Sequence, residues 1–154
     1  MDNAFEIVEA TREDLPALMG LYRQLHETDP VPAGSALQNV WDAILPDPDY
    51  HILLCRADGK LAASVSVIVI KNLTRNARPY AIIENVITDS AYRRRGLAAA
   101  LMAEAVRIAQ TANCYKVLLT TSRKDESVCR FYESCGFNRQ DKTAYIRWLD
   151  RNPV

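Results

Sequence analysis

The sequence predicts an α/β fold in which a central sheet of mixed antiparallel and parallel strands is flanked by helices. Stretches rich in β-branched and aliphatic residues alternate with stretches whose apolar residues recur at helical spacing. An Asp58-Gly59 turn separates two of the strands, which makes them antiparallel neighbours. Over residues 80–121 a strand, a long helix and a second strand follow one another, which is the order of a right-handed parallel crossover.

The first part of the chain is predicted to hold one strand and two helices. Residues 5–10 alternate weakly as a strand, and Thr11 to Asp14 form a capping box before a helix. The helix has an apolar face made of Leu15, Leu18, Met19, Tyr22 and Leu25. Two prolines and a glycine within residues 29–34 end it, and residues 35–45 form a shorter second helix.

The middle of the chain is predicted to be a series of strands. Residues 50–56 and 61–70 flank the Asp-Gly turn and pair antiparallel. A polar connection over residues 71–78 then leads into residues 80–88, another strongly apolar strand. We expect this strand to lie centrally in the sheet.

The last third alternates helices and strands. Residues 97–109 carry the pattern of a long amphipathic helix, and residues 116–121 form a short strand. Residues 125–135 form a helix that Gly136 ends in the C′ position, and a final pair of strands reaches Leu149. No repeat, low-complexity tract or linker interrupts the chain, so we expect a single domain over residues 1–154.

Composition and charge narrow the class of protein. The 19 basic and 19 acidic residues cancel, which gives no reason to expect nucleic acid or an anionic membrane as a partner. The N-terminus has no basic segment followed by an apolar run, and no stretch nears the roughly 20 apolar residues of a membrane span. We therefore expect a cytoplasmic protein. The four cysteines lack CxxC spacing and a histidine nearby, which favours reduced thiols over a disulfide or a zinc site.

The end of the strand at residues 80–88 carries the most chemical information. It leads into Arg93-Arg94-Arg95-Gly96 and then into the long helix. The free N–H groups and positive dipole end of a helix N-terminus favour an anion, and arginines add charge-assisted bonds, so a diphosphate fits there. Three arginines in a row also occur in ordinary solvated loops. Neither GxxxxGK[ST] nor GxGxxG is present, which excludes the familiar triphosphate and dinucleotide motifs.

Two motifs resemble those of a known family. Arg93-x-x-Gly96-x-Ala98 is similar to the pyrophosphate motif Q/R-x-x-G-x-G/A of the GNAT superfamily of N-acetyltransferases. Phe131-Tyr132-Glu133-Ser134-Cys135-Gly136-Phe137 resembles that family's F-Y-x-x-x-G-F. The resemblance extends in element order from about Phe5 to Leu149. It implies the GNAT fold and an enzyme that transfers acetyl from acetyl-CoA to a primary amine by direct attack in a ternary complex.

The resemblance also implies how acetyl-CoA is bound. Backbone groups of Val86, Ile87 and Thr88 would pair with the pantetheine arm, with the acetyl carbonyl against the Ile87 N–H, and a bulge would splay this strand from the next parallel one. Where many relatives have an asparagine that bonds the pantetheine arm, this chain has Asp125, and Ser127 or Ser122 would replace that contact. The pyrophosphate would be held by Arg93, Arg94, Arg95, Gly96, Leu97, Ala98 and Ala99.

Two side chains are candidates for proton transfer. Tyr132 would donate a proton to the CoA sulfur, although its apolar neighbours at helical spacing also fit a core tyrosine. Glu84 interrupts an apolar strand two residues before the acetyl site, where a buried carboxylate is costly without a role, so we expect it to be the general base. An edge or ion-paired glutamate is the alternative. An acyl-enzyme on Cys129 or Cys135 is disfavoured because no histidine lies near either in sequence.

The last predictions concern the amine acceptor and the oligomeric state. In this family the acceptor site is built largely from segments that correspond here to residues 21–42 and 71–79. The basic residues Lys71, Arg75 and Arg78 favour an amine that carries an anionic group, although a solvated loop explains them equally well. The alternatives are a non-catalytic acyl-CoA-sensing module and a protein lysine or N-terminal acetyltransferase. A homodimer is expected through the apolar residues Tyr145, Ile146, Trp148 and Leu149.

Overall fold

The computed structural model describes residues 5–30, 32 and 34–150. The chain divides into two compact units, Met1–Leu119 and Thr120–Val154. Val31 and Ala33, which belong to the expected end of the first helix, lie outside the described residues. So do residues 1–4, on which the expected absence of an export signal depends.

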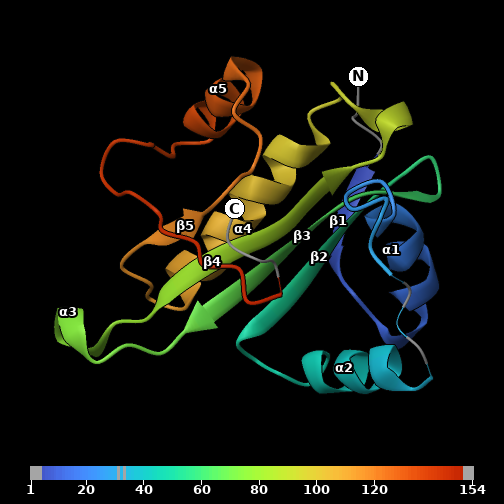
Figure 1. Ribbon diagram of the computed structural model, residues 1–154, viewed down its shortest axis with the longest axis horizontal. Coiled ribbons are helices and arrows are strands. Elements are labelled where there is room, and N and C mark those ends of the chain that lie inside the picture. The colour runs from blue at the N-terminus through green and yellow to red at the C-terminus, as the bar shows by residue number, and fades with distance from the viewer. Residues whose placement is uncertain (1–4, 31, 33, 151–154) are drawn as a thin grey trace. The chain divides into compact units, whose positions relative to one another are not determined.

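The first unit is built on a five-stranded sheet in the order β1-β2-β3-β4-β5 (Figure 1). The pairs β1–β2, β2–β3 and β3–β4 are antiparallel, and the pair β4–β5 is parallel. The mixed sheet is therefore confirmed, and β4 has a neighbour on each side although β3 is the middle strand. The strands are β1 (Phe5–Glu9), β2 (Tyr50–Ala57), β3 (Lys60–Ile70), β4 (Tyr80–Thr88) and β5 (Val117–Leu119).

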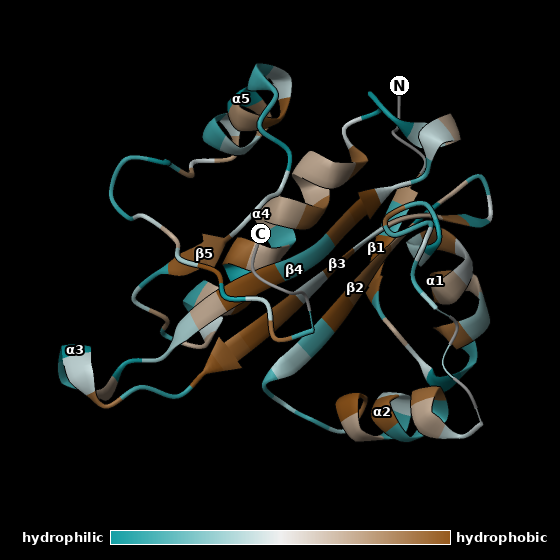
Figure 2. Cartoon of the chain, viewed as in Figure 1, coloured by the Kyte–Doolittle hydropathy of each residue, from teal (hydrophilic) through white to brown (hydrophobic). Residues whose placement is uncertain are grey.

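Helices cover both faces of this sheet, whose strands are largely hydrophobic (Figure 2). On one face, Leu18 and Trp41 meet Ile52 and Leu54 of β2 in a buried cluster. Because successive side chains of a strand point to opposite faces, Leu53 and Cys55 of β2 and Val65 and Val67 of β3 are buried on the other face, where α4 packs. The helices are η1 (Arg12–Asp14), α1 (Leu15–Tyr22), α2 (Ala36–Ile44), α3 (Thr74–Ala77), η2 (Ser90–Tyr92) and α4 (Leu97–Thr111).

Local signals account for several of these elements. The Thr11 N–H donates to Asp14 Oδ2 (2.8 Å), which confirms the capping box before α1. Asp58 and Gly59 both have positive φ (52° and 73°), as the two-residue turn between β2 and β3 requires. The helix α1 ends at Tyr22 and not at Leu25, because the chain turns over residues 23–25.

The connection between β3 and β4 has an unusual backbone. Arg75, Asn76 and Ala77, which belong to the single helical turn α3, have left-handed φ angles of 56°, 61° and 55°. Such a conformation costs roughly 1–2 kcal/mol for each residue other than glycine. The Arg78 guanidinium bonds the carbonyls of Asn113 (3.2 Å) and Cys114 (3.1 Å), so it fixes the end of this connection.

The second unit contains one regular element, the helix α5 (Glu126–Ser134), among its described residues. Gly136 (φ 90°) follows the C-cap Cys135, as expected for the C′ position. The prediction of a final strand pair is wrong, since residues 137–150 form no strand. A strand requires a neighbour's N–H and C=O groups, and the described part of this unit contains no strand with which to pair.

Candidate functional site

Strand β4 carries a bulge at the start of the segment that was expected to bind the acetyl arm, Val86 to Thr88. Its register against β3 pairs Glu84 with Ser66 and Ile87 with Ser64, so Asn85 and Val86 together oppose one residue. Asn85 has a φ of 53°, in the left-handed region that asparagine tolerates better than most residues. The expected bulge is confirmed.

The two parallel strands separate at this bulge. The β4–β5 pairs are Ala81 with Val117, Ile82 with Leu118 and Ile83 with Leu119. Within the described residues, β4 has no β5 partner from residue 84 onward. Beyond Ile83, the edge of β4 that faces away from β3 is therefore not paired with β5, and an extended ligand can pair with it as another strand would.

Backbone direction changes the expected role of Ile87. The Asp89 N–H donates to the Ala62 carbonyl of β3 (2.8 Å). Because N–H groups alternate in direction along a strand, the Ile87 N–H also faces β3, whereas those of Val86 and Thr88 face the open edge. The expectation that the Ile87 N–H meets the acetyl carbonyl is therefore wrong, and its side chain is buried on the sheet.

The arginine-rich segment forms a turn that opens α4. Arg94 (φ 59°) and Gly96 (φ 81°) have left-handed backbones, and Gly96 is the N-cap residue of α4. An added Cβ on Gly96 would meet no atom within 4 Å, so what glycine supplies is this backbone conformation. Leu97 is buried and anchors the arginine-rich turn. Ala98 and the exposed Ala99 keep the first turn of α4 free of bulky side chains. The first N–H groups of the helix have no intrahelical acceptors and can bind an anion.

The three arginines of this turn differ in their contacts. All three are exposed. Arg95 pairs with Asp58 (3.1 Å) and lies over the Tyr92 ring (5.0 Å). No ion pair of Arg93 or Arg94 is found within the part of the chain that the structure describes. Arg93 and Arg94 are therefore better placed to serve an incoming anion than Arg95.

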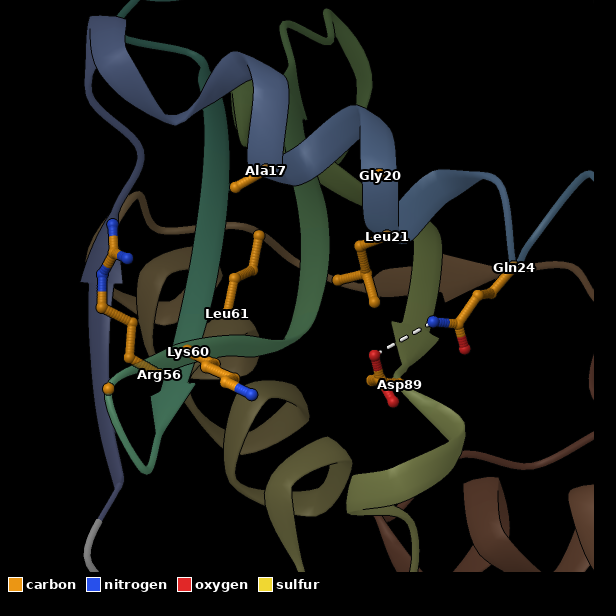
Figure 3. A pocket seen from close by; sticks show the side chains of 9 residues that line it. Ala17, Gly20, Leu21, Gln24, Arg56, Lys60, Leu61 and Asp89 are labelled. Carbon is orange, nitrogen blue, oxygen red and sulfur yellow. Dashed lines mark hydrogen bonds between the residues drawn. The ribbon is translucent and has the colours of Figure 1, made fainter.

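A hydrogen-bonded clamp ties the start of this turn to α1. Gln24 Nε2 donates to Asp89 Oδ2 (3.0 Å) (Figure 3). The Ser90 N–H donates to Gln24 Oε1 (3.1 Å). The other carboxylate oxygen of Asp89 accepts from the Ala91 N–H (2.8 Å). The clamp borders a cavity of about 400 Å³, which Leu21 and Lys60 also line. No local pattern predicts a contact that joins residues 65 positions apart.

Glu84 lies on the α1 face of the sheet and is exposed, so the premise that its carboxylate is buried is wrong. Its side chain shares that face with Ser66, because directly paired residues point the same way. Burial raises the pKa of Tyr50, Ser66 opposes the rise, and the nearby Glu84 charge adds to it. A carboxylate beside the bulge and open to solvent can still accept a proton from a bound amine.

Close to Glu84 lie three buried hydroxyls, those of Tyr22, Ser64 and Ser66, which sequence reasoning missed. Ser64 and Ser66 are fully buried, and their hydroxyls and that of Tyr22 have no hydrogen-bond partner among the described residues. Burial raises the pKa of Tyr22, while Ser66, Ser64 and Asn85 lie close enough to oppose that rise. The sequence signal that could have found them is a pair of serines two positions apart, Ser64 and Ser66, in an otherwise apolar strand.

Tyr132 belongs to the second unit, on the half-buried face of α5. Its ring packs edge-on against Phe131, with centroids 5.1 Å apart. Burial raises the pKa of Tyr132, and Cys135 adds to the rise while Arg123 opposes it. The phenol is therefore protonated at neutral pH and able to donate.

The two serines near the start of α5 were expected to replace an asparagine. The Ser127 hydroxyl donates to Asp125 Oδ2 (2.7 Å), and Arg123 pairs with the same carboxylate (3.1 Å). The Ser127 proton is thus already engaged within its own unit. No hydrogen bond of the Ser122 side chain is found within the described residues.

Comparisons with known proteins agree with this site. A sequence model described as the Acetyltransferase (GNAT) family matches residues 13–137. The chain is 31% identical over 130 residues to the glucosamine 6-phosphate N-acetyltransferase of Trypanosoma brucei brucei, covering 84% of this chain and 86% of that one. It is 28% identical over 121 residues to glucosamine 6-phosphate N-acetyltransferase 1 of Oryza sativa subsp. japonica, covering 77% and 72%.

A solved structure agrees as well. A putative acetyltransferase from Agrobacterium tumefaciens str. C58 superposes with a TM-score of 0.85 and 40% identity, covering 93% of this chain and 99% of that one. The bulged strand, the open edge and the N–H-rich turn fit the pantetheine arm and the pyrophosphate of an acyl-CoA. The chain therefore belongs to the GNAT family of acetyltransferases and is an N-acetyltransferase that uses acetyl-CoA.

Proposed function

We propose that the acceptor is a phosphorylated amino sugar, with glucosamine 6-phosphate as the first candidate. The observation that carries this proposal is the 31% identity, over 84% of the chain, to an enzyme named for that substrate. It sharpens the expectation of a small amine that bears an anionic group.

The basic connection between β3 and β4 gives weaker support. Lys71 is paired with Asp49, and the Arg78 guanidinium bonds two backbone carbonyls. Arg75 lies over the Tyr115 ring (5.8 Å) and has no acidic partner among the described residues. Of these three basic side chains, Arg75 is therefore the one best able to pair with a phosphate.

Acetyl-CoA would bind along the open edge of β4 and at the start of α4. Its pantetheine arm would pair with the backbone of Val86 and Thr88, with the buried Ile87 holding that segment on the sheet. The pyrophosphate would lie against the turn at Arg93, Arg94 and Gly96. When bound, acetyl-CoA supplies an acetyl group on a sulfur leaving group.

The chain's own groups would then act on the transferred atoms. Glu84 would accept the proton that the amine loses as its nitrogen bonds the acetyl carbon. The Val86 N–H would donate to the carbonyl oxygen, where negative charge develops. Tyr132 would donate a proton to the sulfur as the carbon–sulfur bond breaks. The assignment of Tyr132 rests on the F-Y-x-x-x-G-F motif and on its protonated phenol.

The proposed acceptor is tested by comparing glucosamine 6-phosphate with glucosamine under the same conditions. Thiol release from acetyl-CoA is measured for each, and the product is identified by mass spectrometry. Charge-assisted bonds to the phosphate are worth about 1.5–3 kcal/mol, so kcat/KM should be roughly 10- to 150-fold higher for the phosphate. Equal values would refute phosphate recognition.

The same assay separates the other functions. A lysine peptide that outperforms both sugars would identify a protein acetyltransferase. Binding of acetyl-CoA in calorimetry without turnover on any amine would indicate a sensing module. An amine-dependent product only with aminoalkylphosphonates would keep the anionic group but change the scaffold that carries it.

We further propose a homodimeric, cytoplasmic enzyme that unfolds as one domain. Large apolar side chains of the second unit are exposed: Tyr145 (95%), Ile146 (64%), Trp148 (58%) and Leu149 (90%). Contact with a second copy would remove this surface from water. The four cysteines are free thiols, the state that a reducing compartment maintains, and no described helix is long and apolar enough to cross a membrane. Light scattering tests the dimer, and a single calorimetric transition tests the single domain.

A further inference from the structure

Three hydroxyls meet in the interior of the first unit without partners. Ser64 and Ser66 of β3 are both 0% exposed, and Tyr22 reaches them from α1. A buried hydroxyl without a hydrogen bond is destabilising, and alanine or phenylalanine at these positions would avoid that penalty. Three such groups at one point indicate a shared partner.

Their position relative to the bulge is the second observation. Ser64 pairs with Ile87 and Ser66 pairs with Glu84, so the two serines bracket the bulged residues Asn85 and Val86. Asn85 is held in a left-handed conformation (φ 53°), which other contacts must stabilise. Hydroxyl groups on both sides of a strained segment are suited to hold it in place.

One water molecule can satisfy all three hydroxyls. Internal waters make about three hydrogen bonds to otherwise unpaired polar groups, and such sites are polar on several sides. Leu18 and Ile52 beside them are apolar, and the polar groups nearby are the Tyr50 phenol and the side chain of Asn85, which belongs to the bulge itself. The remaining bond of the water would be to the bulge itself.

We propose that Tyr22, Ser64 and Ser66 bind one internal water that supports the bulge, which makes Tyr22 a positioning residue for the Val86 N–H. This proposal rests on the proposed function of that N–H at the acetyl carbonyl. Tyr22 does not touch either substrate. It acts through the water on the direction of a backbone group, so its loss should lower kcat and leave CoA affinity unchanged.

The test replaces the Tyr22 hydroxyl alone, in Tyr22→Phe. We expect a melting temperature lower by about 3–8 °C, because the water loses a partner. We expect kcat to fall roughly 10- to 100-fold, because a small misplacement of a catalytic group has that effect, with the Kd of CoA within about twofold of wild type. The amide resonances of Asn85 and Val86 should shift in a ¹⁵N–¹H spectrum. The matched control is Tyr115→Phe, which removes a phenol just before β5 and should leave kcat unchanged.

The outcomes are distinct. A melting temperature that is unchanged or higher would show that the hydroxyl was merely unpaired, and would overturn the proposal. A lower melting temperature with unchanged kcat would reduce Tyr22 to a structural residue, and would also overturn it.

A double-mutant cycle gives a further check. In a shared-water site, Tyr22→Phe and Ser64→Ala should destabilise together by clearly less than the sum of the single effects, whereas independent hydroxyls would give additive changes and contradict the proposal. If Tyr22→Phe does not fold, Ser64→Ala carries the same measurements. The unfolding and amide measurements need no acceptor, so a failure of the proposed sugar substrate would leave them interpretable.

Discussion

Replacing Gly96 by alanine isolates the backbone requirement of the turn before α4. The residue has a φ of 81°, and a Cβ there would meet no atom within 4 Å. The substitution therefore adds strain and no steric clash. A non-glycine residue in this conformation costs about 1–2 kcal/mol.

The strain can be expressed in two measurable ways. If the turn keeps its shape in Gly96→Ala, unfolding becomes easier by about 1–2 kcal/mol, or roughly 2–8 °C in melting temperature for a chain of this size. If the turn relaxes in the free protein, CoA must restore it, and the Kd rises by about 5- to 30-fold. The two losses should together amount to about 1–2 kcal/mol.

Two other glycines provide controls for this experiment. Gly59→Ala introduces the same kind of strain (φ 73°) in the β2–β3 turn, so it should lower the melting temperature and leave the Kd of CoA unchanged. Gly20→Ala lies inside α1 with nothing within 4 Å, and should stabilise the protein by about 0.5–1 kcal/mol. Calorimetry with CoA and thermal unfolding measure all three variants. Wild-type values of both quantities in Gly96→Ala would refute the reasoning.

Further predictions concern the general acid, the partly buried ion pair between Asp14 and Arg56, and the clamp on the turn. Tyr132→Phe should lower kcat about 10²- to 10⁴-fold, which thiol release measures; a smaller loss would return Tyr132 to a packing role. Burial alone would raise the pKa of Asp14, but bonds from Thr11 and Arg56 outweigh it and lower that pKa. Asp14→Asn should therefore lower the free energy of unfolding in urea by about 1–2 kcal/mol at pH 7. This difference from wild type should disappear as the pH falls below about 4, through the lowered pKa of Asp14. A constant difference down to pH 2 would contradict this. Gln24→Ala should raise the Kd of CoA about 2- to 12-fold, whereas Gln38→Ala on α2 should not.

Features that depend on neighbours in sequence could be predicted. The capping box at Thr11, the turn at Asp58 and Gly59 and the start of α4 after Gly96 are each determined by a few adjacent residues. The mixed sheet followed from the order of such elements. The two motifs that identify the family are short and contiguous for the same reason.

Features that depend on contacts between residues distant in the sequence could not be predicted. Glu84 was expected to be buried because its strand is apolar, but exposure depends on which face of the sheet the residue occupies and where α1 ends. The direction of the Ile87 N–H follows from the register with β3, which a bulge shifts by one residue. The expected strands after Gly136 required a pairing partner that no periodicity can specify.

The order of strands in the sheet has a consequence for how the first unit assembles. Every strand lies beside the one that precedes it in the chain. The antiparallel pairs β2–β3 and β3–β4 close short loops, residues 58–59 and 71–79, and can form one after another. Helices lie between the strands of the other two pairs, α1 and α2 between β1 and β2 and α4 between β4 and β5. Of these two pairs, β4–β5 has the shorter register, three residue pairs against five. We therefore expect β5 to dock last in folding and to open first in local unfolding. Amide hydrogen exchange should then be fastest, among the strands that flank the acetyl-CoA site, in β5.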